Sequence, residues 1–163
     1  MKNSFYENIV MTDKFIAKVE MAASCLLLVA IVIIVGLGVF MRYVLNNPLV
    51  ASTDLSTLIL VWMSFIAASA IYKEKGHLAI EFISDRIPSG LRKITLLAVN
   101  IIIAATLIVI MIHTIRLVLL QWGQEIIGLG VPRCLLSLPI VIMSTLMFLT
   151  TIQHVITEFR KLP

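Results

Sequence analysis

Three histidines and two cysteines are the side chains of this sequence best suited to redox or metal chemistry. Two histidines at the same depth in a helical membrane protein can hold a haem between them. His113 lies near one end of an apolar run, whereas His77 and His154 lie toward the opposite membrane face, so only these two could meet. Bis-histidine haem ligation therefore stays open at that one face.

The other reactive residue types show no catalytic or metal-binding spacing. Cys25 and Cys134 are expected at opposite membrane faces, so we predict no disulfide between them. The sequence contains no glycine-rich phosphate loop, no HExxH and no CxxC, and it pairs no nucleophile with an evident base. We predict that the protein is not an enzyme and that it has no catalytic, metal or cofactor-binding residues.

Long apolar runs of the sequence determine where these histidines and cysteines lie in the fold. The chain has 163 residues, of which 60% are hydrophobic and 13% charged, and its mean hydropathy is +1.06, which is unlike a soluble domain. Four runs contain no charged residue, and at about 1.5 Å per residue the shortest reaches roughly 27 Å, close to the thickness of a hydrocarbon core. The predicted fold is one all-α membrane domain, 1–163, with four transmembrane helices at about 21–41, 54–72, 94–116 and 134–157.

The distribution of lysine and arginine predicts the orientation in the bilayer. A net charge of +4 can indicate nucleic-acid binding in a soluble protein, but in a membrane protein the basic residues mark the cytoplasmic side. Assigning alternate sides along the chain leaves three basic residues outside and ten inside. The three are Arg42, Arg116 and Arg133, and the ten are Lys2, Lys14, Lys18, Lys73, Lys75, Arg86, Arg92, Lys93, Arg160 and Lys161. Both termini, including an amphipathic lead-in at 1–20, are therefore predicted in the cytoplasm, and no nucleic-acid partner is expected.

A polar break at 73–93 separates the two pairs of apolar runs. A helix over about 77–88 would put an apolar side that includes Phe82 and Ile83 opposite a side of acidic residues, a pattern typical of a helix lying in the membrane interface. The alternating apolar residues also fit a short strand, but a lone strand beside lipid leaves backbone groups unpaired. We predict an interfacial amphipathic helix that ends at Pro88.

The second apolar run contains a candidate surface for a partner helix. Ser64 and Ala68 are four residues apart, so they share one helix face on which another helix can pack closely. Trp62 lies deeper than the usual aromatic belt. We interpret Trp62, Ser64, Ala68, Phe82 and Ile83 as the candidate contacts with a partner subunit. Burial against lipid or within the chain is the alternative for Trp62.

No ionisable residue lies where an active transporter needs one. All nine Asp and Glu residues fall outside the four uncharged runs, and Pro139 lies near the end of its run. Moving ions or polar solutes across a membrane usually requires charges or broken helices near the midplane. We therefore interpret the chain as a membrane protein that works through its surfaces, and a standalone exporter or channel is disfavoured.

Several short motifs occur in a fixed order along the chain. They are Arg42-Tyr43-Val44-Leu45-Asn46-Asn47-Pro48 after the first run, Asp54 at the start of the second, Leu60-Val61-Trp62 before small residues, Gly76-His77-Leu78-Ala79-Ile80 after the second run, and Pro132 with Pro139 near the start of the fourth. In this order and at these spacings the motifs resemble the DctQ-like small membrane subunit of tripartite ATP-independent periplasmic (TRAP) transporters. Members of the family often have Trp and Glu before the second span. This chain has Asp54 there and lacks the Trp.

The resemblance implies two protein partners and a role. A large TRAP membrane subunit is expected to carry the substrate site and the sodium coupling, and a periplasmic solute-binding protein is expected to deliver an organic acid such as a C4-dicarboxylate, a keto acid or sialic acid. The small subunit is then a scaffold for the large one in the lipid bilayer of the bacterial inner membrane. It needs no cofactor of its own.

Five charged residues predicted on the periplasmic side are candidates for docking the binding protein. They are Arg42, Asp54, Arg116, Glu125 and Arg133. Anchoring at the membrane edge is the alternative role for these charges. The alternative function for the whole chain is a haem-carrying or anchoring membrane subunit of an oxidoreductase.

Overall fold

The computed structural model describes the backbone over residues 2–47, 50–84 and 89–161, and side-chain environments over 13–47, 51–74, 95, 97–153 and 155–156. Its elements are α1 (Lys2–Tyr43), α2 (Val50–Ser84), α3 (Ser89–Gln121), β1 (Glu125–Ile126), β2 (Val131–Pro132), the 3-10 helix η1 (Arg133–Leu136) and α4 (Leu138–Lys161). The prediction of four helices long and apolar enough to cross a membrane is confirmed. The apolar parts are Asp13–Tyr43, Ala51–Glu74, Leu97–Gln121 and Arg133–Gln153.

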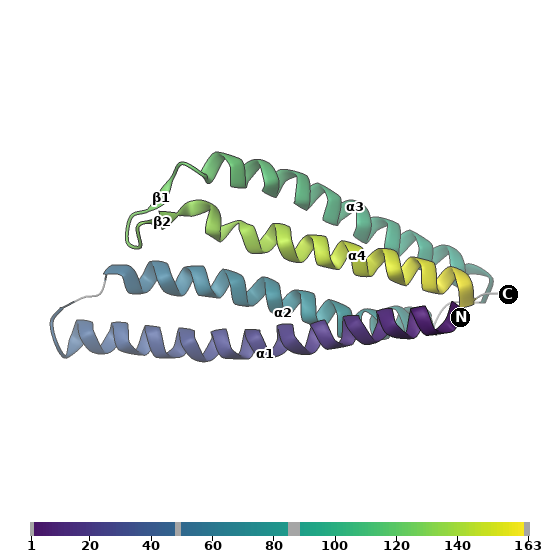
Figure 1. Cartoon of the computed structure of the whole chain (residues 1–163), viewed down its shortest axis with the longest axis horizontal. Coiled ribbons are helices and arrows are strands. Elements are labelled where there is room, and N and C mark those ends of the chain that lie inside the picture. The colour runs from purple at the N-terminus through teal and green to yellow at the C-terminus, as the bar shows by residue number, and fades with distance from the viewer. Residues whose placement is uncertain (1, 48–49, 85–88, 162–163) are drawn as a thin grey trace.

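The four helices lie side by side in the order α1, α2, α4, α3 (Figure 1). α2 packs along α1 and against α4, and α4 packs along α3, so α1 and α3 form the two edges of the arrangement. α1 begins and α4 ends at the same end of the molecule, while the hairpin of β1 and β2 lies at the other end (Figure 1). If each of the four helices crosses the membrane once, the beginning of α1 and the end of α4 lie on the same side of it.

The seam between α1 and α2 has a regular spacing. Residues that are buried or half-buried recur on α1 at 17, 20, 24, 27, 31, 34, 38 and 41. Their spacing alternates between three and four residues, as it does in left-handed helix pairs. At Gly38 the two helices come close, because a Cβ there would lie 3.0 Å from the Ser52 hydroxyl oxygen. This spacing decides which α1 residues point at α2 and which point outward.

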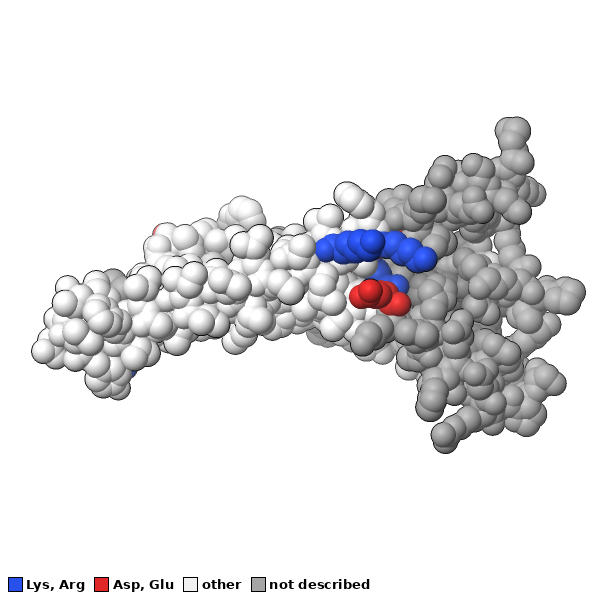
Figure 2. Space-filling model, turned by 90° about the horizontal axis from the view of Figure 1, so that it is seen from below, with Lys and Arg blue, Asp and Glu red and all other residues white. Residues whose placement is uncertain are grey.

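Small and hydroxyl residues dominate the buried positions. Within the described part of the chain, the buried polar residues include Ser24, Ser69, Ser144, Thr150 and Thr151. Large apolar side chains lie outside instead, as expected where lipid covers them and small residues let helices approach. Figure 2, which looks onto the α1 side, shows the charged side chains gathered toward the end where the chain begins, and most of the remaining described surface is uncharged.

α2 continues through the segment that hydropathy marks as a break. Residues 77–84 are helical, but they prolong the helix of the second span and do not begin a new one. Lys and Glu are good helix formers, and the single Gly76 costs a helix only about 1 kcal/mol, so a change in polarity did not end the helix. The position of this segment in the membrane interface stays a prediction, and 85–88 lie outside the described residues. The lead-in at 1–20 likewise belongs to one helix with the first span, from Lys2 onward.

Candidate functional site

A buried ion pair joins α1 to α2 toward the end where the chain begins. The Lys73 ammonium on α2 donates a hydrogen bond to Oε1 of Glu20 on α1. Lys73 is 8% exposed and Glu20 is 7% exposed, so both charges are almost fully removed from the surface. Glu20 occupies a covered position of the α1 seam between Ala17 and Ser24. Because Glu20 lies on the face of α1 that packs against α2, its carboxylate points toward α2.

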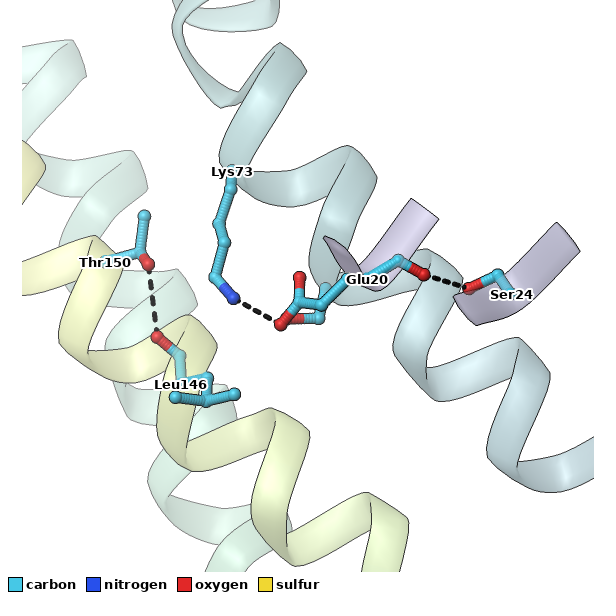
Figure 3. Close-up of polar contacts among 6 residues, drawn as sticks. Glu20, Ser24, Lys73, Leu146 and Thr150 are labelled. Atoms are coloured by element: carbon cyan, nitrogen blue, oxygen red, sulfur yellow. Dashed lines mark hydrogen bonds and ion pairs between the residues drawn. The ribbon is translucent and has the colours of Figure 1, made fainter. Parts of the chain in front are cut away.

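Two serine hydroxyls bond to Glu20, one to its carboxylate and one to its backbone carbonyl. Ser69, one helical turn before Lys73, donates its hydroxyl to the same Glu20 oxygen at 3.2 Å. Ser24 donates its hydroxyl to the Glu20 backbone carbonyl at 2.8 Å. Figure 3 shows Lys73 reaching from α2 to Glu20, with Leu146 and Thr150 of α4 on the other side of the lysine. The pair therefore lies where three helices approach one another.

A second polar contact ties α2 to α4 at this end. The hydroxyl oxygens of Tyr72 and Thr151 are 2.7 Å apart. Thr151 donates its own hydrogen to the Met147 carbonyl at 2.8 Å, so Tyr72 is the donor in the contact between the two side chains. α2 is thus held on one side by an ion pair and on the other by a neutral hydrogen bond.

Within the described part of the chain, the hydrogen bonding of the buried pair is incomplete. Taking a charge out of water costs several kcal/mol per ion, and mutual pairing offsets this cost only when the geometry is good. Glu20 Oε2 has no hydrogen-bond partner among the described residues, so the pairing of Glu20 depends on Lys73 and Ser69 alone. Within the same described ranges, no three His, Cys, Asp or Glu side chains gather as a metal site.

A β-hairpin covers the start of α2 at the opposite end of the molecule. β1 pairs with β2 in antiparallel register, and Gly130 in the connecting turn has a φ of 63°, which glycine adopts without steric cost. Asp54 on α2 accepts a hydrogen bond from the Gly128 backbone N–H at 3.1 Å. A Cβ on Gly128 would overlap this carboxylate. Asp54 therefore fixes the hairpin on α2.

The charged residues predicted to dock a binding protein divide into two groups. Arg42, Arg116, Glu125 and Arg133 are exposed, whereas Asp54 is half-buried beneath the hairpin. Glu20 and Lys73 form the one ion pair found among the described residues, so the four exposed charges are not neutralised by pairing with one another. Their docking role stays a prediction.

The predicted partner-facing residues also divide. Ser64 and Ala68 are exposed on α2, and Ser64 donates its hydroxyl to the Leu60 carbonyl one turn earlier at 2.7 Å. Trp62 is half-buried, and its indole N–H donates to the Leu135 carbonyl of η1 at 3.0 Å. Trp62 thus makes a contact within the chain. Phe82 and Ile83 lie on α2, but their side chains are outside the described residues.

The histidines and cysteines do not come together in the described part of the chain. His113 is exposed on α3, and its Nδ1 donates to the Val109 carbonyl at 2.9 Å. Cys25 is exposed and Cys134 is buried, and both are free thiols. The side chains of His77 and His154 are outside the described residues.

Sequence reasoning missed the pairing of Glu20 with Lys73, because it assigned Lys73 to the cytoplasmic basic residues and Glu20 to the amphipathic lead-in, and otherwise used both as limits of uncharged runs. A usable signal was present on α1. Ala17, Glu20 and Ser24 recur at the spacing of a helix seam, which points Glu20 toward a neighbouring helix. The spacing on α1 does not, however, identify Lys73 as the partner of Glu20.

Four membrane-length helices held together by small residues, hydroxyls and one buried ion pair define a multi-pass membrane protein. The family model of the DctQ component of tripartite ATP-independent periplasmic transporters matches residues 31–161. The chain therefore belongs to the DctQ family, and it is the small permease subunit of a TRAP transporter and not an enzyme.

Three relatives were compared with this chain. A Haemophilus influenzae protein named as a TRAP transporter small permease is 25% identical over 148 residues, which cover 91% of this chain and 90% of the relative. The sialic acid TRAP transporter small permease protein SiaQ of Vibrio cholerae is 25% identical over 97 residues, 60% of this chain and 56% of SiaQ. The sialic acid TRAP transporter permease protein SiaT of Haemophilus influenzae is 29% identical over 82 residues, 50% of this chain but only 13% of SiaT.

Proposed function

We propose that the chain is the stationary scaffold of a TRAP transporter and that it packs against the large membrane permease through α2. The observation that carries this proposal is a stripe of residues on α2 that is exposed in the described part of the chain. The exposed positions recur along one face and are Thr53, Thr57, Leu60, Ser64, Ala68, Ile71 and Glu74. Most of them are small, which is typical of surfaces where membrane helices meet closely.

Two hydroxyls in this stripe already donate to backbone carbonyls of α2. Thr57 donates to the Thr53 carbonyl at 2.9 Å and Ser64 to the Leu60 carbonyl at 2.7 Å. A partner helix can therefore approach α2 without leaving buried donors unsatisfied. The packing energy would come from van der Waals contact over the small side chains, because lipid tails are as apolar as the helix surface.

The similarity to SiaT supports a permease as the occupant. The matched stretch is a small part of that permease, so a segment resembling half of this chain lies in the same polypeptide as a much larger permease. In SiaT the peptide chain itself keeps the segment that resembles this protein together with the rest of the permease. A small subunit that is a separate chain needs instead a surface that binds its permease. The α2 stripe meets this requirement.

The substrate we propose is an organic acid of the C4-dicarboxylate, keto acid or sialic acid class, taken up with sodium by the permease after delivery by a periplasmic binding protein. Sialic acid should be assayed first, since SiaT and SiaQ are named for it. The excess of basic residues near both termini supports a cytoplasmic position for that end. The hairpin and the exposed Arg42, Arg116, Glu125 and Arg133 would then face the binding protein.

The test is copurification of the large permease with tagged full-length chain from mild detergent. Tryptophan at Ser64 or Ala68 should lower the recovered permease about tenfold or more, because overpacking a helix interface costs about 1–3 kcal/mol. Tryptophan at Val32, which is 65% exposed on the edge helix α1, is the matched control. The elution volume of the chain itself should stay unchanged, since the stripe residues are exposed among the described residues.

Two negative results have different meanings. If the unmodified chain recovers no large permease, the scaffold role is wrong. If it recovers the permease and both tryptophan variants recover it equally well, the role stands but the α2 stripe is not the surface. Sodium-dependent uptake of sialic acid by the reconstituted complex then tests the substrate separately.

A further inference from the structure

A cavity of about 240 Å³ lies between α1, α2 and α4, next to the Glu20–Lys73 pair. Its polar lining consists of Asp13, Lys73, Thr150 and Gln153, and its apolar lining consists of Ile16 with two leucines of α4. The volume is below the roughly 300–1,000 Å³ of most small-molecule sites. The cavity is therefore suited to one chemical group of a larger molecule.

The lining residues are ordered along the helices. Lys73 ends the uncharged run of α2, and Asp13 and Gln153 line the cavity with it. Ile16 lies about one helical turn nearer the middle of α1 than Asp13, and Leu149 lies about one turn nearer the middle of α4 than Gln153. The polar lining is thus nearer the end of the bundle where α1 begins, and the apolar wall lies further inside.

The cavity offers both signs of charge. The Lys73 ammonium has three hydrogens to donate, and one of them goes to Glu20. The Asp13 carboxylate is close enough to interact electrostatically with both Lys73 and Glu20. Thr150 donates its hydroxyl hydrogen to the Leu146 carbonyl at 3.1 Å, so its oxygen is left as an acceptor. One cationic donor and two acceptors, together with the amide of Gln153, therefore border a cavity with an apolar floor.

We infer that this cavity binds the headgroup of phosphatidylethanolamine, a zwitterionic phospholipid with a primary ammonium. The phosphate is placed against Lys73, the ammonium against Asp13 and Thr150, and the start of an acyl chain against Ile16. Phosphatidylglycerol lacks the ammonium and brings its phosphate near the Asp13 carboxylate without compensation. Phosphatidylcholine carries a cation but has no N–H to donate. The inference goes beyond the scaffold role and does not depend on the transported solute.

Native mass spectrometry of the full-length chain, purified in mild detergent and titrated with the three lipids carrying identical acyl chains, tests the inference. Phosphatidylethanolamine should be retained about tenfold more strongly than either of the others, as expected for one charge-assisted hydrogen bond. Asp13→Asn keeps the shape and leaves the Glu20–Lys73 pair in place, so it should fold. It should lose the preference and retain phosphatidylglycerol at least as well as phosphatidylethanolamine. Lys14→Gln, an exposed neighbour outside the cavity, should retain the unmodified preference.

Equal retention of the three lipids by the unmodified chain overturns the inference. So does an Asp13→Asn variant that still prefers phosphatidylethanolamine. The same titration on the chain copurified with its permease provides a third readout. If the lipid binds the chain alone but not this complex, a side chain of the permease fills the cavity and the lipid assignment is wrong. None of these readouts measures uptake, and the first two use the chain alone, so those two fail or succeed independently of the proposed function.

Discussion

Removing one member of the Glu20–Lys73 pair should destabilise the protein far more than removing both. Glu20→Gln leaves the Lys73 ammonium without its carboxylate at a position only 8% exposed, and Lys73→Met leaves the Glu20 carboxylate unpaired at 7% exposure. Breaking a buried ion pair in this way costs about 3–5 kcal/mol. Since about 1.4 kcal/mol is a factor of ten, a loss of about 4 kcal/mol lowers the ratio of folded to unfolded protein roughly a thousandfold.

The double variant should recover most of this loss. With both substitutions neither position 20 nor position 73 carries a charge, and replacing a buried ion pair by neutral side chains of similar volume is often neutral or stabilising by about 1–4 kcal/mol. Ser69 can still donate to the amide oxygen at position 20. If each single variant costs about 4 kcal/mol and the double variant about 1 kcal/mol or less, the coupling energy of the double-mutant cycle is about 7 kcal/mol, well above the roughly 0.5–3 kcal/mol usual for contacting residues.

Unfolding of the purified chain in mixed micelles, followed by circular dichroism as the denaturing detergent increases, measures these free energies. Lys18→Met is the matched control, because Lys18 is an exposed lysine on α1 close to Glu20. It should change the free energy of unfolding by less than about 0.5 kcal/mol. The reasoning is refuted if both single variants cost less than about 1 kcal/mol, or if the double variant is no more stable than the single ones.

Three further predictions concern the hairpin, the indole contact and the topology. Gly128→Ala should displace the hairpin from α2 and make its proteolysis faster. Gly123→Ala, with nothing within 4 Å of its Cβ, should leave the rate of proteolysis unchanged. Equal rates of proteolysis for the two variants would contradict the contact between Asp54 and the hairpin. Trp62→Phe should cost about 1–3 kcal/mol by leaving a backbone carbonyl unpaired, and unchanged thermal unfolding would show that the hydrogen bond contributes nothing. In a cysteine-free background, an impermeant thiol reagent added to intact cells should label Asn47→Cys but not Lys14→Cys, and the reverse pattern would invert the proposed topology.

The number of membrane helices could be predicted from the sequence, but their ends could not. The hydrocarbon core requires about twenty apolar residues per helix, so a run without charges is a direct physical signal. The helix itself ends where backbone hydrogen bonding fails, which is a separate condition. Lys73, Glu74 and Lys75 end the apolar run but favour the helix, and α2 continues to Ser84.

The hairpin between α3 and α4 was also beyond sequence reasoning. Its strands have two residues each, too few to show the alternation that identifies a strand. Its position depends on the hydrogen bond from Gly128 to Asp54, which joins residues 74 apart in the sequence. The acidic residue at the start of the second span was noticed as part of a family motif, but its contact required the packed structure.

A charged residue at the end of an apolar run has two physical interpretations, a solvated anchor or one half of a buried pair, and hydropathy gives the same value for both. Lys18 and Glu20 are two residues apart on α1, yet Lys18 is exposed and Glu20 is buried. The spacing of the α1 seam separates them, because Glu20 follows Ala17 by three residues and Lys18 does not fall on that face. On α2 the equivalent face carries Ser69 and Lys73, one turn apart. The sequence thus restricts each charge to a face of its own helix, while the pairing of those faces is decided only by the packing of α1 on α2.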